Sequence, residues 1–383
     1  MANSRKSPGE MSAQTGPHPA TAGPAAASDL TKHDLAHITE DTIRKHNFTI
    51  DWELQRFISE ISERYHIYYG AVAVMDSRRG DILALYGNSL SGEDCRLALD
   101  TEIAASVFKL VTATAAMEQC GFNGSSRFFY AGNAHTLYTN QLTKKRDRWS
   151  TDVTLTEAFA RSNNVVFAKL GTEYLGKAPI ALTARRLGFG RSPLRVLDAP
   201  ASVLFSPQNE YNLAELASGF NHATRISPLH AAEMVTAALN GGYLVSPRLI
   251  KTERCEKTPA MRMDTAEHLR DMMERTVKSG TVAKHFRGTA SDRVLKGLTI
   301  GGKSGSLDGT DPDGRRNWFV GFASDQQSGE AITIGCVLVL RERFRIQADM
   351  LSRLIIKEYF SRKAIAAQTA MPAAKARVSP NRL

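Results

Sequence analysis

The sequence has few cysteines, and their spacing matches no common cysteine motif. Four occur in 383 residues, at Cys95, Cys120, Cys255 and Cys336. This low number excludes a small disulfide scaffold, and no two of them have the C-x-x-C spacing of a structural zinc site or a thioredoxin-like redox site. Four separated thiols fit an oxidising or a reducing compartment, so they leave the location of the protein open.

Long hydrophobic runs are also missing. The most apolar stretch, residues 331–340, has about half of the roughly 20 residues that a helix needs to cross a bilayer. Arg5 and Lys6 near the N-terminus are not followed by an apolar segment. We therefore expect neither a signal peptide nor a membrane anchor in this chain.

What the sequence does contain is typical of a globular protein. Hydrophobic residues make up 42% and charged residues 23%, which excludes a mostly disordered or fibrous chain. The chain carries 49 Lys and Arg against 39 Asp and Glu, a net charge of +10. Such a charge attracts nucleic acid, anionic lipid and acidic cell-wall polymer alike. We interpret the local basic cluster as a solvated loop face rather than a binding patch: Lys144, Lys145, Arg146 and Arg148.

Composition divides the chain into three parts. Residues 1–46 form an arm and linker that we expect to be disordered, because the first 30 positions are rich in Ala, Pro, Ser, Gly and Thr and have no apolar periodicity. Residues 47–365 have the texture of a globular domain. Residues 366–383 are Ala-rich and basic, which predicts a disordered tail.

The linker contains a pair of histidines that could bind a metal. His33 and His37 are four positions apart, so on a helix they would share a face and could ligate a metal together with Glu40 or Asp41. Two histidines without a third convergent ligand make a weak site. We therefore predict a short polar helix or linker here, and no metal.

Strand patterns lie at both ends of the globular part, with helical patterns between them. The expected elements are a helix over 50–61, a hairpin of strands 69–75 and 81–86, helices within 103–285, strands 318–323 and 332–340, and a helix over 345–360. The simplest assembly is an α+β fold, in which one antiparallel β-sheet is flanked by helices and stands beside an all-helical lobe. A site is expected in the cleft between sheet and lobe.

The first candidate motif is Ser106-Val107-Phe108-Lys109, which opens an apolar helix. Positions i and i+3 lie on one face of a helix, so Ser106 and Lys109 should project together. A serine hydroxyl is a weak nucleophile unless a base takes its proton. Lysine is such a base only when neutral, and burial or a nearby second cation lowers its pKa. Alone, the motif equally describes a helix-start serine and a surface lysine.

The second candidate is Ser162-Asn163-Asn164, a polar triplet between two helical runs. As a structural feature it is a helix cap. As a functional feature, Ser162 relays protons and Asn164 donates a hydrogen bond to a substrate amide. The triplet alone does not separate these interpretations.

The third candidate is the segment 301–306, Gly-Gly-Lys-Ser-Gly-Ser. A strand of small residues lets a substrate backbone lie beside it, and Lys303, Ser304 and Ser306 suit a substrate carboxylate. The backbone N–H groups of Ser306 and Ser106 could form an oxyanion hole. The glycine spacing does not match the phosphate-binding G-x-x-x-x-G-K-[ST] loop.

The order of the three motifs, S-x-x-K, S-x-N and K-[ST]-G, resembles the penicilloyl-serine transferase superfamily, and most closely the transpeptidase domain of penicillin-binding proteins. The resemblance covers about 47–365. Other segments also resemble the family, namely residues 48–55, 70–76 with 80–84, 226–229, 240–242 and 279–281. One departure is Ser304, where the transpeptidases more commonly have Thr; Ser supplies the same hydroxyl.

The resemblance implies a role for each motif residue. By it, Ser106 is the acylated nucleophile, Lys109 its general base and Ser162 a proton relay. It also implies a set of substrate-binding residues, namely Asn164, Lys303, Ser304, Gly305 and Ser306. The family fold, a sheet flanked by helices beside a helical lobe, agrees with the layout read from the patterns.

The reaction implied is acyl transfer from a D-Ala-D-Ala stem peptide of peptidoglycan to an amine or to water, without metal or cofactor. The implied partners are stem peptides, β-lactam antibiotics and other cell-wall synthesis proteins, with no nucleic acid. The implied location is the periplasm or cell envelope. The sequence leaves open a serine β-lactamase or β-lactam sensor, although no E-x-x-L-N segment follows Ser162 as class A enzymes require. It also leaves open a non-catalytic scaffold and an unrelated basic binding protein.

Overall fold

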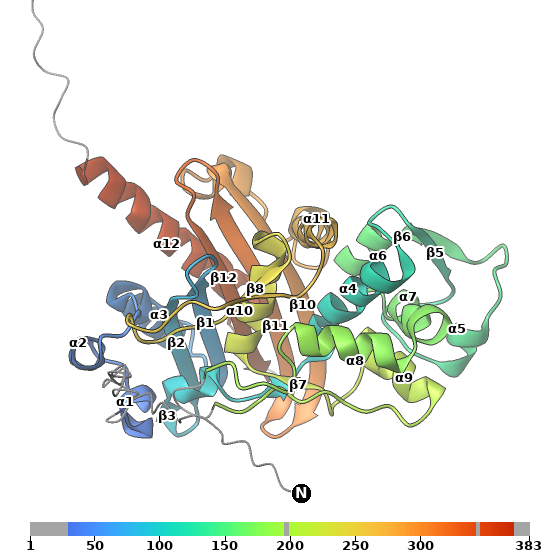
Figure 1. Cartoon of the computed structure of the whole chain (residues 1–383), viewed down its shortest axis with the longest axis horizontal. Coiled ribbons are helices and arrows are strands. Elements are labelled where there is room, and N and C mark those ends of the chain that lie inside the picture. The colour runs from blue at the N-terminus through green and yellow to red at the C-terminus, as the bar shows by residue number, and fades with distance from the viewer. Residues whose placement is uncertain (1–29, 195–198, 342–344, 371–383) are drawn as a thin grey trace, which may run out of the picture.

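The structure is a computed structural model that describes residues 30–194, 199–341 and 345–370. The predictions of disorder for 1–29 and 371–383 concern residues outside this description. The described chain forms a sheet lobe and a helical lobe that lie side by side (Figure 1). This arrangement confirms the α+β fold class read from the sequence.

The sheet lobe is built on six strands in the order β10-β11-β12-β1-β2-β3, and every neighbouring pair is antiparallel. The first and the last strand in chain order, β1 and β12, are neighbours in the middle of the sheet, where Gly70 is paired with Leu338. The bounds are β1 Gly70–Asp76, β2 Ile82–Ser89, β3 Gly92–Glu93, β10 Leu298–Thr310, β11 Asp313–Asp325 and β12 Ala331–Leu340. The strands expected at both chain ends are therefore present, and β11 is longer than the predicted 318–323.

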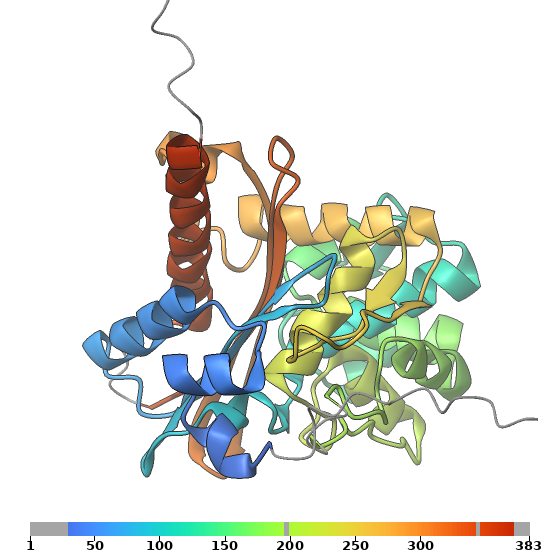
Figure 2. The same ribbon diagram turned by 60° about the vertical axis from the view of Figure 1, so that its left-hand side comes forward.

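Helices cover both faces of this sheet (Figure 2). One face carries α3, Trp52–Arg64, and α12, Ala348–Ala370; the other carries α10, Pro228–Leu239, and α11, Met263–Ser279. The helix α3 begins where the Asp51 side chain accepts a hydrogen bond from the backbone N–H of Leu54 at 3.1 Å, which satisfies one free N–H of the first turn. Its apolar stripe then faces the sheet, as the helical spacing predicted.

The helical lobe consists of short helices packed around α4. The bounds are α4 Lys109–Cys120, α5 Thr139–Thr143, α6 Leu155–Ala160, α7 Asn164–Lys169, a π-helical turn Leu170–Leu175, α8 Lys177–Arg186 and α9 Glu210–Ser218. The lobe is not entirely helical, because β5, Arg127–Tyr130, pairs with β6, Thr151–Thr154. Three consecutive aromatic residues in β5, Phe128, Phe129 and Tyr130, favour a strand at this position.

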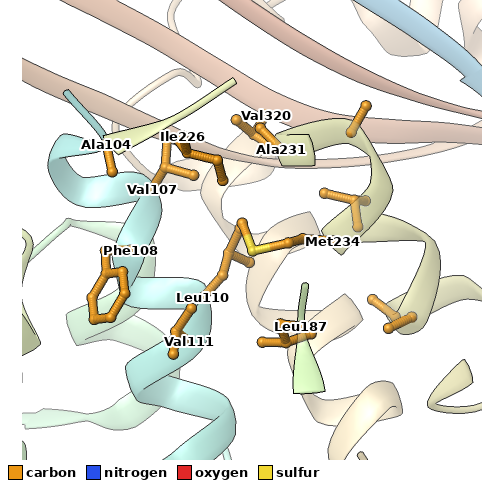
Figure 3. Packing of buried hydrophobic residues seen from close by; sticks show 14 of the residues in the cluster. Ala104, Val107, Phe108, Leu110, Val111, Leu187, Ile226, Ala231, Met234 and Val320 are labelled. Carbon is orange, nitrogen blue, oxygen red and sulfur yellow. The ribbon is translucent and has the colours of Figure 1, made fainter. Parts of the chain in front are cut away.

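One continuous apolar core joins the two lobes beneath the cleft. Figure 3 shows Leu110 in the first turn of α4 and Val107 in the turn just before it, on the side of Met234 of α10, with Val320 of β11 near Ala231 at the sheet. All five side chains are buried. Since the same packed cluster holds α4 and the sheet, the residues at the start of α4 have a fixed position relative to the strands.

Small elements complete the fold and connect the lobes. They are the pair β4 Glu102–Ile103 with β7 Arg225–Ile226, the pair β8 Tyr243–Val245 with β9 Lys257–Pro259, and the 3₁₀ turns Cys95–Ala98, Ala105–Phe108, Thr289–Ser291 and Leu295–Gly297. The strand β4 directly precedes the turn that carries Ser106. Its pairing with β7 therefore fixes the chain just before the first candidate motif.

The described part of the predicted arm, residues 30–46, is not disordered. It contains α1, Lys32–Ala36, and α2, Glu40–His46, and the side chains of Leu35 and Ile38 are buried in the core. Thr31 and Thr39 each form a capping box at a helix start, a local signal that outweighs the composition of the segment. The rings of His33 and His37 lie edge to face 5.8 Å apart.

The C-terminal boundary also differs from the prediction, because α12 continues to Ala370 rather than ending at 360. Alanine is the best helix former, so the Ala-rich composition that suggested a tail extends the helix here. No helix within the described ranges is long and apolar enough to cross a membrane. Within the same ranges, no group of three or more His, Cys, Asp or Glu side chains is arranged to hold a metal ion.

Candidate active site

The nucleophile candidate lies in a tight turn at the start of α4. Ser106 is in the 3₁₀ turn Ala105–Phe108, and Lys109 is the first residue of the helix. Residues i and i+3 eclipse one another in a 3₁₀ turn, and Lys109 Nζ donates a hydrogen bond to Ser106 Oγ at 2.9 Å. Ala105 has a φ of 47°, a left-handed conformation that an alanine rarely adopts and that is typical of functional sites. The sequence-predicted pairing of serine and lysine is therefore present.

Lys109 is completely buried and has three hydrogen-bond partners. Besides Ser106, its Nζ donates to Asn164 Oδ1 at 2.8 Å and to the backbone carbonyl of Ser218 at 2.6 Å. Burial, and then the charge of Lys303, hold the pKa of Lys109 well below its usual range. A lysine in this environment loses its proton near neutral pH more readily than one in water, as a general base requires. Sequence reasoning missed Ser218, because a backbone carbonyl leaves no residue signature.

The second motif forms the turn between α6 and α7. Ser162 has a φ of 56°, and its Oγ accepts a hydrogen bond from Lys303 Nζ at 2.9 Å. The capping role that the sequence left open belongs to Asn163, whose side chain accepts from the N–H of Val166 at 3.0 Å. Ser162 and Asn164 both line the cleft.

Asn164 connects the nucleophile to a loop that the sequence analysis did not single out. Its Oδ1 accepts from Lys109, while its Nδ2 donates to the backbone carbonyl of His135 at 2.8 Å. Its backbone N–H donates to the carbonyl of Ala134 at 2.7 Å. The loop around His135 is thus anchored to the S-x-N motif.

The third motif lies on β10, at the sheet edge next to the helical lobe. Lys303 is buried, and burial lowers its pKa to about 7. Its Nζ also donates to the carbonyl of Ser304 at 2.7 Å. Ser304 Oγ lies 2.5 Å from Thr281 Oγ1, which adds a hydroxyl that the sequence motif did not include. Ser306, two positions further along the strand, is exposed.

Gly305 explains how this strand comes so close to the nucleophile turn. A Cβ at this position would lie 3.3 Å from the backbone nitrogen of Val107 and 3.2 Å from Cβ of Trp318. Contacts this short are tighter than most side chains tolerate, so a glycine lets β10 pack directly against the residue after Ser106. The close approach brings the backbone of Ser306 toward that of Ser106.

Two buried side chains of β11 hold the sheet against the strand before the nucleophile. Arg316 Nε donates to Glu102 Oε2 at 3.0 Å, and Trp318 Nε1 donates to the carbonyl of Ile103 at 2.8 Å. Glu102 and Ile103 form β4, which leads into the Ser106 turn. These links were not predicted, because they join positions more than 200 residues apart in the chain.

All three motifs open into one cleft between the lobes. A cavity of about 430 Å³ is lined by residues of both, including Ser106, His135, Ser162, Asn164, Ser304, Gly305 and Ser306. The two motif lysines lie behind this surface and each donates to a serine that lines it. A serine, a buried lysine of lowered pKa and a second serine–lysine pair are the parts of an acyl-transfer site that uses a covalent serine intermediate.

This site and fold define a penicilloyl-serine transferase-type domain. Residues 70–339 match the model of the penicillin binding protein transpeptidase domain. The match covers most of the chain, and the chain belongs to this family.

Individual relatives are similar at low identity. Stage V sporulation protein D of Bacillus subtilis (strain 168) is 25% identical over 212 residues, which are 52% of this chain and 32% of that protein. A peptidoglycan D,D-transpeptidase FtsI homolog of Mesostigma viride is 22% identical over 309 residues, 67% of this chain and 50% of that protein. The chain thus spans half or less of the length of these curated relatives.

A solved structure shows the same fold. Penicillin binding protein 3 from Mycobacterium tuberculosis, in complex with aztreonam, superposes with a TM-score of 0.66 at 18% identity. The superposition covers 83% of this chain and 79% of that chain. At this identity the likeness supports the fold and not a particular substrate.

Proposed function

We propose that this chain is a serine acyltransferase that acts on D-Ala-D-Ala stem peptides of peptidoglycan, as a D,D-transpeptidase or a D,D-carboxypeptidase. The observation that carries the proposal is the 2.9 Å hydrogen bond between Ser106 Oγ and the fully buried Nζ of Lys109. The family supports a serine acyltransferase of the cell wall. The site geometry supplies a role for each residue.

In the first half-reaction, neutral Lys109 takes the proton of Ser106 as Oγ attacks the carbonyl between the two D-alanines. The backbone N–H groups of Ser106 and Ser306 stabilise the negative oxygen of the tetrahedral intermediate. The bond to the terminal D-alanine then breaks, and its amine receives a proton through Ser162. The second lysine, Lys303, supports this relay because it already donates to Ser162 Oγ.

In the second half-reaction, an amine of a neighbouring stem peptide or a water molecule attacks the acyl-enzyme. A new amide or a free carboxylate forms, and the bond to Ser106 Oγ breaks. Lys109 remains 2.9 Å from this oxygen in the free site and delivers the proton that regenerates the hydroxyl. The first outcome cross-links two stems, and the second trims one.

The terminal carboxylate of the donor binds at the strand β10. Lys303 supplies a positive charge, and Ser304, Thr281 and Ser306 supply hydroxyl groups beside it. A carboxylate that approaches Lys303 favours its charged form and raises its lowered pKa, so binding and protonation support each other. The same positions suit the carboxylate of a β-lactam, and a β-lactam occupies the structurally similar protein from Mycobacterium tuberculosis.

Cell-wall substrates place the reaction at the cell envelope, where peptidoglycan is built. The relatives with cell-wall names support this location. We further propose stem peptides and β-lactams as the ligands of the cleft, and other cell-wall synthesis proteins as partners.

The proposal is tested with a fluorescent penicillin, read by intact-protein mass spectrometry. We expect wild-type protein to gain one penicilloyl group, Ser106→Ala to gain none, and Ser125→Ala, an exposed serine of the same lobe, to behave as wild type. Lys109→Ala should acylate several orders of magnitude more slowly, because the serine loses its base. A covalent adduct on the Ser106→Ala protein would overturn the assignment. Rapid loss of the label would indicate a β-lactamase, and absence of any label a non-catalytic domain.

A further inference from the structure

His135 is one of several titratable side chains that line the cleft and have no part in the mechanism above; the others are Lys284, Asp308, Arg315 and Asp349. His135 belongs to the loop between β5 and α5, and it forms the wall of the cavity together with Ser106, Ser162 and Asn164. Its side chain is exposed to this cavity. An imidazole beside a nucleophile is a common proton acceptor at neutral pH.

Two hydrogen bonds hold the backbone of His135. Its carbonyl accepts from Asn164 Nδ2 at 2.8 Å, and its backbone N–H donates to Asn133 Oδ1 at 2.9 Å. The side chain is exposed and lines the cavity, so the ring is accessible to a ligand in the cleft.

The charges around the ring favour its neutral form. Desolvation first, and then the charges of Lys109 on α4 and Lys303 on β10, lower the pKa of His135, while the nearby backbone of Ser162 raises it. Both of these charged neighbours are cations. A neutral imidazole between them is able to accept a proton, and it offers a positively charged ligand a hydrogen-bond acceptor.

The second half-reaction creates a need for such a group when the acceptor is an amine. A side-chain amine of the lysine type has a pKa of about 10.4, so at neutral pH it arrives as an ammonium ion and is no nucleophile. Two protons must therefore leave its nitrogen. One passes through Lys109 to Ser106 Oγ as the ester breaks, and the other needs a second acceptor before the nitrogen can attack. A water molecule is already neutral and attacks with the loss of one proton; the acid that forms releases the second proton afterwards.

We propose that His135 is a catalytic residue of transpeptidation, the base that takes the ionisation proton of the acceptor ammonium; the inference rests on the proposed acyl transfer. The ammonium N–H donates to the unprotonated ring nitrogen, and the proton moves to the imidazole as the amine nitrogen attacks. The C–N bond forms, the bond between the acyl carbon and Ser106 Oγ breaks, and Lys109 carries the second amine proton to Oγ. The imidazolium then releases its proton to solvent through the open cleft.

The proposal separates two acceptors and therefore has a selective test. A peptide ending in D-Ala-D-Ala serves as donor and Nα-acetyl-lysine amide, whose only amine is the side-chain one, as acceptor. Mass spectrometry quantifies the amide and the hydrolysis product between pH 5 and 9. In His135→Gln, which keeps a hydrogen-bonding side chain but takes no proton, amide formation should fall roughly tenfold to a thousandfold. Hydrolysis and penicillin labelling should stay within about twofold of wild type. The control His268→Gln changes a histidine of α11 that does not line the cleft.

The pH profile distinguishes proton transfer from a structural role. In both proteins the ratio of amide to hydrolysis product should rise with pH as more of the acceptor amine loses its proton. Wild type should show a further rise at acidic pH as His135 becomes neutral, and His135→Gln should lack this further rise. If labelling, hydrolysis and amide formation all fall together, His135 only supports Ser162, and the proposal is wrong. An unchanged ratio in His135→Gln, or a wild-type protein that only hydrolyses, also overturns it, while acylation of Ser106 would remain intact. A wild-type protein that never acylates would instead refute the proposed function.

Discussion

Lys303 lowers the pKa of Lys109, although the two lysines donate to different serines. Lys109 Nζ reaches Ser106 Oγ and Lys303 Nζ reaches Ser162 Oγ, each at 2.9 Å. Both side chains are completely buried, so their charges are poorly screened by water. In the proposed mechanism, the cation that binds the substrate carboxylate therefore also helps to keep the general base neutral.

The first prediction concerns this coupling. In Lys303→Ala a neighbouring cation is lost, so the pKa of Lys109 should rise toward its usual value and the acidic limb of the acylation rate should move to higher pH. Carboxylate binding should also weaken, by roughly 1.5–3 kcal/mol. Lys303→Arg keeps the charge in a different geometry and should shift the limb less. Stopped-flow penicillin acylation against pH measures both effects.

A matched control is Lys284→Ala, which removes a lysine of the same cleft that is not among the causes of the lowered pKa of Lys109. Its acidic limb should coincide with that of wild type. Superimposed profiles of Lys303→Ala and wild type, in height and midpoint, would show that Lys303 has neither role.

The second prediction concerns stability. The pKa of Lys303 is lowered from 10.5 to about 7, so between these pH values the unfolded chain binds a proton that the folded chain does not. Stability linked to this group should therefore increase with pH from about 7 to about 10.5 and be constant outside this window, with a slope of at most about 1.4 kcal/mol per pH unit. Urea unfolding of wild type and Lys303→Met across the window gives the difference directly.

Lys303→Met should be the more stable protein at pH 7, and this advantage should shrink as pH rises. The control Lys278→Met replaces an exposed lysine of α11 that is bonded to Glu274, and should show no such trend. Parallel curves for Lys303→Met and wild type would mean that Lys303 stays charged in the folded protein.

The sequence predicted the part of the site that depends on short spacing. Ser106 and Lys109 lie one turn apart, so helical geometry alone brings them together. The acceptors that complete the environment of Lys109 could not be predicted in this way. The carbonyl of Ser218 lies 109 residues further along the chain, and every residue type has a carbonyl.

The same distinction holds for the fold. Strands with strong apolar patterns, such as β12, were predicted within a residue or two, because their burial is visible in their composition. A short helix or linker was predicted around His33 and His37, where α1 lies, but α2 and the packing of this segment on the core were missed. A compositional argument averages over the segment, whereas the capping residues Thr31 and Thr39 act locally. The contact of His135 with Asn164 depends on a loop path, which no periodicity encodes.

The third prediction concerns the buried ion pair between the sheet and the nucleophile strand. Arg316→Ala leaves Glu102 charged, buried and without its guanidinium, which should destabilise the fold by about 3–5 kcal/mol. Because Glu102 directly precedes the Ser106 turn, acylation should also slow in the fraction that remains folded. Thermal unfolding and penicillin acylation at low temperature measure these two effects separately.

Arg341→Ala is the control for this change, since Arg341 is exposed and its Nε donates to the carbonyl of Asp313. Its stability should stay within about 0.5 kcal/mol of wild type. Equal stability of the Arg316→Ala and Arg341→Ala proteins would show that the buried pair does not hold the two parts together.

The fourth prediction concerns the N-terminal helices. Leu35 of α1 is 2% exposed and belongs to the main core, so Leu35→Ala should lower the free energy of unfolding by about 2–5 kcal/mol through lost burial and the cavity that remains. Leu90→Ala makes the same chemical change at a side chain that is 74% exposed and should have an effect below about 0.5 kcal/mol. Penicillin acylation should be unchanged in both proteins, because α1 does not line the cleft. Urea unfolding measures the stability of both variants. If they are equally stable, α1 does not pack on the domain in solution. The segment before residue 47 then behaves as the linker that its composition suggested.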